Sequence, residues 1–117
     1  MIEITNTSRE FNEVERYLMT VSPSIKSVKD IPDNTSIPVD GYLEFTDTKE
    51  DGTVSEILSI ITPDMDVYSS QSKTFKRSLI DIANIMGDKK FAVVKISGTT
   101  NAGRPYVNCT LDTSSIK

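Results

Sequence analysis

The sequence predicts a mainly β domain, with five strands and a single helix between the third strand and the fourth. Two observations carry this prediction. After residue 37, apolar and polar residues alternate in short runs separated by turn formers, which is typical of strands. One run departs from this pattern, because Phe75, Leu79, Ile82 and Met86 recur at helical spacing. The 117 residues, 37% hydrophobic and 26% charged, suffice for one domain without disulfides.

An amphipathic helix is predicted over residues 8–20. The segment Thr7-Ser8-Arg9-Glu10 has the Thr-x-x-Glu form of a capping box, and apolar residues recur at helical spacing after it. The helix should end near Pro23. Residues 22–35, which contain two prolines and an Asp-Asn turn signal, are expected to connect this helix to the strands.

The first three strands are predicted over residues 37–46, 54–62 and 67–69. The second has a continuous apolar run, which indicates a strand buried on much of both faces. Alternation in the first divides its side chains into two sets. Those expected to face the core are Val39, Leu43 and Phe45, and those expected to face outward are Asp40, Tyr42 and Glu44.

The helix that follows should be capped by Ser72 or Thr74 and stopped by Gly87. Strands over residues 91–97 and 106–112 complete the domain, joined by a loop over 98–105 that is rich in turn formers. Three strands, a helix and two strands form the element order of the OB-fold, a five-stranded Greek-key barrel that binds oligonucleotides and oligosaccharides.

The expected architecture is therefore one compact domain. Residues 1–35 would form a helical extension at the amino terminus, and residues 36–117 would form a five-stranded OB-fold barrel with its helix between strands three and four. That helix would close one end of the barrel.

Charge is distributed unevenly along the chain. Residues 1–72 carry 5 Lys and Arg against 14 Asp and Glu, whereas residues 73–117 carry 8 against 3. A polyanion is expected to bind the basic third. The alternative is that the cations there only form the solvated faces of a helix and a strand. They include Lys73, Lys76, Arg77, Lys89, Lys90 and Lys95.

Enzyme activity, a cofactor and a metal site are not expected. The chain has no histidine, which removes the usual proton shuttles and most zinc sites, and it has no glycine-rich phosphate loop. Its acids lie mostly in turns, which disfavours a metal-dependent nuclease. The single Cys109 is expected to be a small buried residue in a reducing compartment. With neither a signal peptide nor a membrane span recognisable, a cytoplasmic location is expected.

Alternation along the last two strands predicts a nucleic-acid-binding face. If Val94 and Ile96 point inward, Lys95 points outward, and if Val107 and Cys109 point inward, Tyr106 and Asn108 lie outward beside it. Exposed rings can stack on bases while cations neutralise phosphates. For the tyrosines the alternative is ordinary pairing across the sheet. With Arg104 of the loop and two helix cations, the predicted binding residues are Lys95, Arg104, Tyr106, Tyr42, Asn108, Lys73 and Arg77.

The runs 68–82 and 95–109 resemble small single-stranded DNA-binding proteins of bacteriophages that infect Gram-positive hosts, chiefly through the hairpin Gly98-x-x-x-x-Gly103-Arg104-x-Tyr106. The resemblance covers residues 37–112. It implies an OB-fold without catalysis that coats single-stranded DNA during phage replication or recombination in the host cytoplasm. Lys95, Arg104 and Tyr106 would then carry binding.

The resemblance also implies partners. They would be single-stranded DNA, replication or recombination proteins, and further copies of the chain, without a membrane. Bacterial proteins of this type recruit partners through an acidic tail, whereas residues 111–117 carry one acid, so recruitment by a tail is not expected. The alternative function is a non-enzymatic phage protein-interaction module, an adaptor or host-modulating factor, that uses the acidic helix face and an exposed sheet edge.

Overall fold

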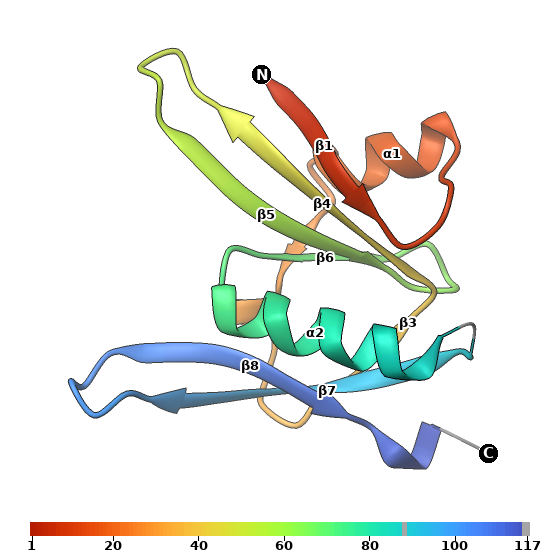
Figure 1. Cartoon of the computed structure of the whole chain (residues 1–117), viewed down its shortest axis with the longest axis vertical. Helices are drawn as coiled ribbons and strands as arrows, with labels where there is room; N and C mark the ends of the chain where they lie inside the picture. Colours follow the sequence, from red (N-terminus) through yellow and green to blue (C-terminus); the bar gives the residue numbers. More distant parts are fainter. Residues whose placement is uncertain (88, 116–117) are drawn as a thin grey trace.

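The computed structural model describes residues 1–87 and 89–115. Within these residues, eight strands form two sheets, and two α-helices and two short 3-10 helices accompany them (Figure 1). The predicted mainly β class is confirmed. The strands are β1 (Ile2–Thr7), β2 (Lys26–Ser27), β3 (Ser36–Val39), β4 (Gly41–Thr48), β5 (Val54–Ile61), β6 (Val67–Ser70), β7 (Phe91–Thr99) and β8 (Pro105–Leu111). The helices are α1 (Glu13–Thr20), η1 (Val28–Asp30), α2 (Lys73–Met86) and η2 (Thr113–Ser115).

The two sheets are joined by one extended segment. The five-stranded sheet has the order β1-β4-β5-β6-β2, and the three-stranded sheet has the order β3-β7-β8. Only Asp40 separates β3 from β4, so the predicted first strand is divided between the sheets. The Asp40 amide donates to the Ile61 carbonyl of β5 at 2.9 Å and holds the division in place.

The two sheets do not close into a single barrel. In a closed barrel of this element order, β6 and β8 would be neighbours. Within the described residues, however, β6 pairs with β5 and with β2, and β8 pairs with β7. The short strand β2 runs parallel to β6, where Lys26 and Ser27 face Tyr68 and Ser69. The connector between α1 and β3 thus occupies the edge that closure would require.

The predicted helix in the second half of the chain is confirmed as α2. The Ser72 hydroxyl accepts a hydrogen bond from the Phe75 amide at 3.2 Å, which satisfies one of the orphan donors of the first turn. Gly87 ends the helix at a φ of 62°, in the left-handed region that glycine adopts without strain. Ser72 also donates to the Val107 carbonyl of β8 at 2.8 Å, so the cap fastens α2 to the second sheet.

The predicted helix over residues 8–20 is wrong in its first half. Residues 2–7 form strand β1, which pairs antiparallel with β4, and α1 begins only at Glu13. Asn12 and Glu15 together form the capping box of α1. The Asn12 side chain accepts a hydrogen bond from the Glu15 amide at 2.8 Å, and the Asn12 amide donates to the Glu15 carboxylate at 3.0 Å. Residues 1–35 therefore supply strands as well as a helix.

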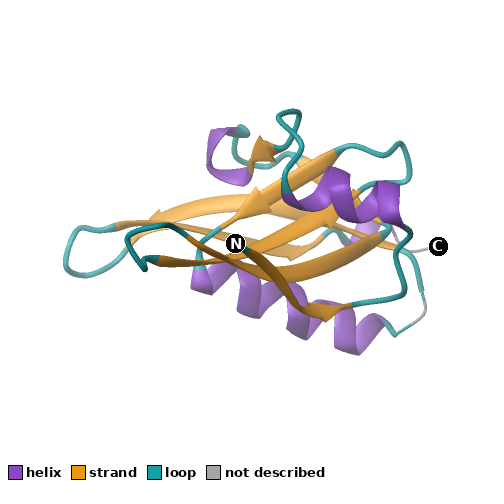
Figure 2. Cartoon of the chain, turned by 90° about the horizontal axis from the view of Figure 1, so that it is seen from above, coloured by secondary structure: helices purple, strands orange, loops and turns teal. Residues whose placement is uncertain are grey.

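Two apolar clusters lie on opposite faces of the central strands. One fills the space between the sheets and α2, and it contains Tyr42, Leu58, Ile60, Phe75 and Leu79. The other lies under α1, and it contains Phe11, Met19, Leu43, Phe45, Ile61 and Val67. Figure 2 shows α1 and α2 on opposite sides of the strands.

Strands β4 and β5 are consequently buried on both faces over much of their length, as predicted for β5. Tyr42 was expected to point outward, but it is buried in the cluster beneath α2. The alternation in β4 separates two cores rather than a core and solvent, because α1 covers the second face. Among the described residues, no helix is long and apolar enough to cross a membrane.

Candidate nucleic-acid interface

A groove with a volume of about 650 Å³ lies between β6 and the β7–β8 hairpin. It occupies the side where the sheets fail to close. In Figure 1 the β4–β5 and β7–β8 hairpins extend toward the same side of the molecule, with the connection from β6 to α2 between them. The residues that line it are Ser27, Lys29, Ile57, Ser69, Ser70, Gln71, Ser72, Lys95, Ser97, Pro105, Tyr106 and Val107.

Tyr106 lies at the edge of this groove and is 36% exposed. Its ring covers Gly98, so its side chain is on the face of the β7–β8 pair opposite to that of Lys95, Ser97 and Val107, and the predicted position of Tyr106 beside Lys95 is wrong. Its position depends on Gly98, which faces it across the β7–β8 pair. A Cβ atom on Gly98 would lie 2.5 Å from the Tyr106 Oη atom, far inside van der Waals contact. The glycine therefore makes room for the ring, and the predicted outward orientation of Tyr106 is confirmed.

Lys95 was predicted to point outward, and this orientation is wrong. The residue is only 4% exposed, and its Nζ atom donates to the Ile31 carbonyl at 2.7 Å and pairs with the Asp33 carboxylate at 3.0 Å. The reason is the connector, which runs along β7: the Lys95 amide donates to the Thr35 carbonyl, and the Asn34 amide donates to the Lys95 carbonyl. The alternation in β7 is accordingly the reverse of the prediction, with Val93 buried and Val94 half-buried.

The Lys95 charge is largely neutralised within the chain. Ser97 donates to the Asp33 carboxylate at 2.7 Å, and this bond, followed by the bond from Lys95, lowers the pKa of Asp33 below its ordinary value. Asp33 therefore stays ionised and continues to offset the ammonium charge. Lys95 forms part of the groove wall, but its positive charge is held by Asp33 instead of being free for a ligand.

Arg104 lies in the exposed turn of the β7–β8 hairpin, directly before the groove residue Pro105. The turn is ordered by its own backbone: the Thr100 amide donates to the Arg104 carbonyl, and the Gly103 amide donates to the Thr100 carbonyl, both at 2.8 Å. Among the described residues the guanidinium group makes no ion pair within 4.0 Å. Its charge is therefore available in the exposed turn of the hairpin.

The other predicted residues are dispersed. Asn108 is half-buried on β8 outside the groove lining, and its Oδ1 atom accepts from the Cys109 amide. Lys73 is exposed next to the groove residue Ser72, and Arg77 is exposed one turn further along α2. Cys109 is buried as predicted, and burial raises the pKa of its thiol to about 12. The structure thus places Tyr106 and Arg104 on the β7–β8 hairpin and Lys73 next to Ser72 of the groove, and it buries Tyr42 in the core.

Two features of the groove were missed from the sequence. Lys29 of η1 is exposed and lines the groove, although it is remote in sequence from the basic third. Hydroxyl side chains form much of the remaining surface and can donate to or accept from either a base edge or a phosphate. These are Ser27, Ser69, Ser70, Ser72 and Ser97. The run Ser69-Ser70-Gln71-Ser72 was the available signal, but its polar residues were assigned to a strand end and a helix cap.

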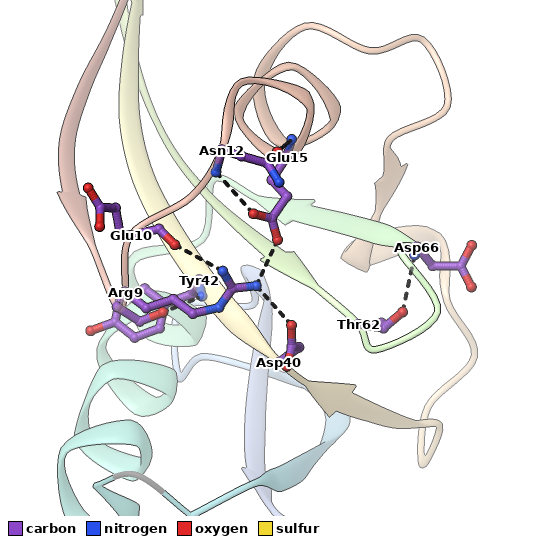
Figure 3. Close-up of polar contacts among 9 residues, drawn as sticks. Arg9, Glu10, Asn12, Glu15, Asp40, Tyr42, Thr62 and Asp66 are labelled. Atoms are coloured by element: carbon purple, nitrogen blue, oxygen red, sulfur yellow. Dashed lines mark hydrogen bonds and ion pairs between the residues drawn. The ribbon is translucent and has the colours of Figure 1, made fainter.

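A second polar network lies at the β3–β4 junction, away from the groove. The Arg9 guanidinium pairs with the Glu15 and Asp40 carboxylates, both at 2.8 Å, and donates to the Glu10 carbonyl at 3.0 Å (Figure 3). It also lies 4.3 Å from the centroid of the Phe11 ring. The bond to Glu15 is the main reason that the pKa of Arg9 is raised and that of Glu15 is lowered. Arg9 therefore holds the start of α1 against the sheets.

No protein-family model matches the chain, and no curated protein or solved structure is significantly similar to it.

Proposed function

We propose that the chain binds single-stranded DNA, largely without sequence preference, in the groove between β6 and the β7–β8 hairpin. The observation that carries the proposal is the position of Tyr106, a partly exposed ring over Gly98 at the edge of an open groove, on the same hairpin as the exposed Arg104. A ring so placed can stack on a base of any identity, and the cation can neutralise the neighbouring phosphate. The hydroxyls of the lining suit backbone contacts.

The fold supports the same proposal. Apart from β1, α1 and β2, the elements follow the OB-fold order, and the continuous β3–β4 segment contributes to both sheets. We propose that the protein is an OB-fold whose barrel is left open at the binding groove. In the hairpin loop between the last two strands, Arg104 lies where OB-folds contact their ligands. The role that fits is coating of DNA strands during phage replication or recombination.

The exposed cations nearest the groove are few. Lys29 lines it, and Lys73 and Arg104 lie beside it. Because each neutralised phosphate releases about one counterion, such a small set predicts a moderate dependence of affinity on salt, with a slope of about −2 for three contacts on a single strand. A protein that bound any polyanion through its whole basic surface would show a steeper slope and would bind duplex equally well.

Binding to labelled oligo-dT and to a duplex of equal length, at two salt concentrations, tests the proposal. We expect oligo-dT to bind more tightly than duplex. Tyr106→Ala should weaken oligo-dT binding about tenfold, because a stacked base contributes roughly 1–3 kcal/mol. Tyr106→Phe, which keeps the ring, is the matched control and should retain most of the affinity.

Arg104→Ala should also weaken binding and reduce the salt slope by about one phosphate contact. Arg16→Ala is its control, because Arg16 is an exposed arginine on α1, outside the groove lining. Absence of an oligo-dT complex at low salt would refute the proposal and favour a protein-interaction module. Equal loss in the Arg104 and Arg16 variants would place binding outside the groove.

A further inference from the structure

The outer face of α1 carries an apolar patch. Val14, Tyr17 and Val21 recur at helical spacing, and each of these residues is more than half exposed. Met19 of the same helix is fully buried against the sheet. Met65, in the turn between β5 and β6, adds a further exposed apolar side chain beside Leu18. We call these four residues, Val14, Tyr17, Val21 and Met65, the α1 patch. An apolar cluster with a polar surround is typical of an interaction site.

The surroundings of the α1 patch are mainly acidic. Glu10 and Glu13 lie at the start of α1, and Asp64 and Asp66 flank Met65; all four are exposed. Arg16 is the exposed cation of the helix, and Arg9 is already paired with two carboxylates. A partner for this patch should therefore combine an apolar side chain with several positive charges.

The same chain carries a surface of that description on α2. Ile85 is 82% exposed, on the helix face that also presents Arg77 and Asp81. Lys89 and Lys90 follow the end of the helix and are exposed. Residues 73–90 carry five Lys and Arg against two acids, Asp81 and Asp88, so the segment has a net positive charge. We call Arg77, Ile85, Lys89 and Lys90 the α2 face.

We propose that the α1 patch of one copy binds the α2 face of a second copy. The two surfaces cannot meet within one molecule, because α1 and α2 lie on opposite sides of the strands (Figure 2). Pairing of two α1 patches would place acid against acid, and pairing of two α2 faces would place base against base. Only the unlike pairing buries apolar side chains and brings opposite charges together.

Such a contact is heterologous, so each copy has one surface of each kind left for a further neighbour. The association needs no nucleic acid and is independent of the proposed function. If the chain also binds single-stranded DNA, the contact would link neighbouring molecules along the strand and make their binding cooperative.

Sedimentation velocity of the full chain without DNA, over a range of protein and salt concentrations, tests the contact. We expect the mass to rise with protein concentration and to fall at high salt, where charge attraction is screened. Tyr17→Glu should abolish the association by placing a charge in the α1 patch, and Ile85→Glu should abolish it from the α2 face. Both sites are exposed, and circular dichroism would verify that each variant is folded. Val54→Glu, at an exposed apolar residue on β5, is the matched control and should associate normally.

Mixing the two variants gives the sharpest result. Tyr17→Glu retains an intact α2 face, and Ile85→Glu retains an intact α1 patch, so an equimolar mixture should form dimers and stop there. A wild-type chain that stays monomeric at every concentration and salt would overturn the proposal. So would a mixture that remains monomeric, or an Ile85→Glu variant that still self-associates, because either result excludes the unlike pairing.

Discussion

Arg9 and Lys95 both attach the amino-terminal segment to the sheets, but they do so in different surroundings. The Arg9 side chain is 37% exposed and has two carboxylate partners, whereas the Lys95 side chain is 6% exposed and has one carboxylate and one carbonyl. Water competes for the Arg9 contacts and hardly reaches the Lys95 ammonium group. A cation in the basic third can thus be part of the structure, while the charge available to a ligand lies on its exposed neighbours.

Removal of Lys95 should have the largest effect on stability. Lys95→Met keeps the length of the side chain but leaves the Ile31 carbonyl without its donor, and hydrogen bonds to charged groups contribute about 1.5–3 kcal/mol. We expect the free energy of unfolding, measured by urea denaturation, to fall by about 2 kcal/mol.

The salt slope of oligo-dT binding should not change in Lys95→Met, because the ammonium charge is held by Asp33. Ser97→Ala, which removes only a hydroxyl donor to Asp33, is the control for stability. It should lower the free energy of unfolding by less than Lys95→Met does. A Lys95→Met protein of unaltered stability with a smaller salt slope would instead make Lys95 a phosphate ligand.

Removal of Arg9 should have a smaller effect. Exposed ion pairs contribute roughly 0.2–1 kcal/mol each, so Arg9→Met should lower the free energy of unfolding by about 1 kcal/mol. The loss should be local, with faster hydrogen exchange of the α1 amides and little change in β7. Arg16→Met, at an exposed arginine of the same region, is the matched control. If Arg9→Met and Lys95→Met lowered the free energy of unfolding equally, the exposed and the buried attachment would not differ in strength.

The pH dependence of the Lys95 attachment is the smallest expected effect. The pKa of Asp33 is lowered in the folded chain from an ordinary value of 3.8, so its ionised form stabilises the fold above that pH. The contribution is lost as the pH falls from about 4 through the lowered pKa. The difference in stability between wild type and Asp33→Asn should therefore narrow over that range, as followed by thermal denaturation. A difference that stays constant down to pH 2 would exclude the carboxylate charge as its source.

Local signals predicted the elements of the second half of the chain well. Ser72, Gly87 and the alternation in β5 act through neighbouring backbone, so their effects can be inferred from a few residues of sequence. The amino-terminal strand was missed because Thr7 and Glu10 imitate a helix cap, and the similar pair Asn12 and Glu15 lies five residues later. Short-range rules cannot choose between two such caps.

The site was harder to predict because its geometry depends on long-range packing. Alternation divides a strand into two faces, but it does not say which face another segment covers. Ile31 and Asp33 bind the Lys95 side chain on one face of β7, and α2 covers the face of β4 that holds Tyr42. Tyr106 was correctly oriented because Gly98 and the hairpin turn fix it locally. The serine lining has no periodicity, and its one local signal, the run Ser69-Ser70-Gln71-Ser72, is also what a strand end and a helix cap look like.

The extended segment formed by β3 and β4 has a consequence for how the molecule opens. Its backbone hydrogen bonds belong to both sheets, with β3 bonded to β7 and β4 bonded to β1 and β5. Neither sheet can separate from this segment without disturbing the residue that joins the two halves, Asp40. The sheets should therefore unfold as one cooperative unit, and the amides of Ile37 and of residues 39–45 should exchange with solvent only when the whole chain unfolds.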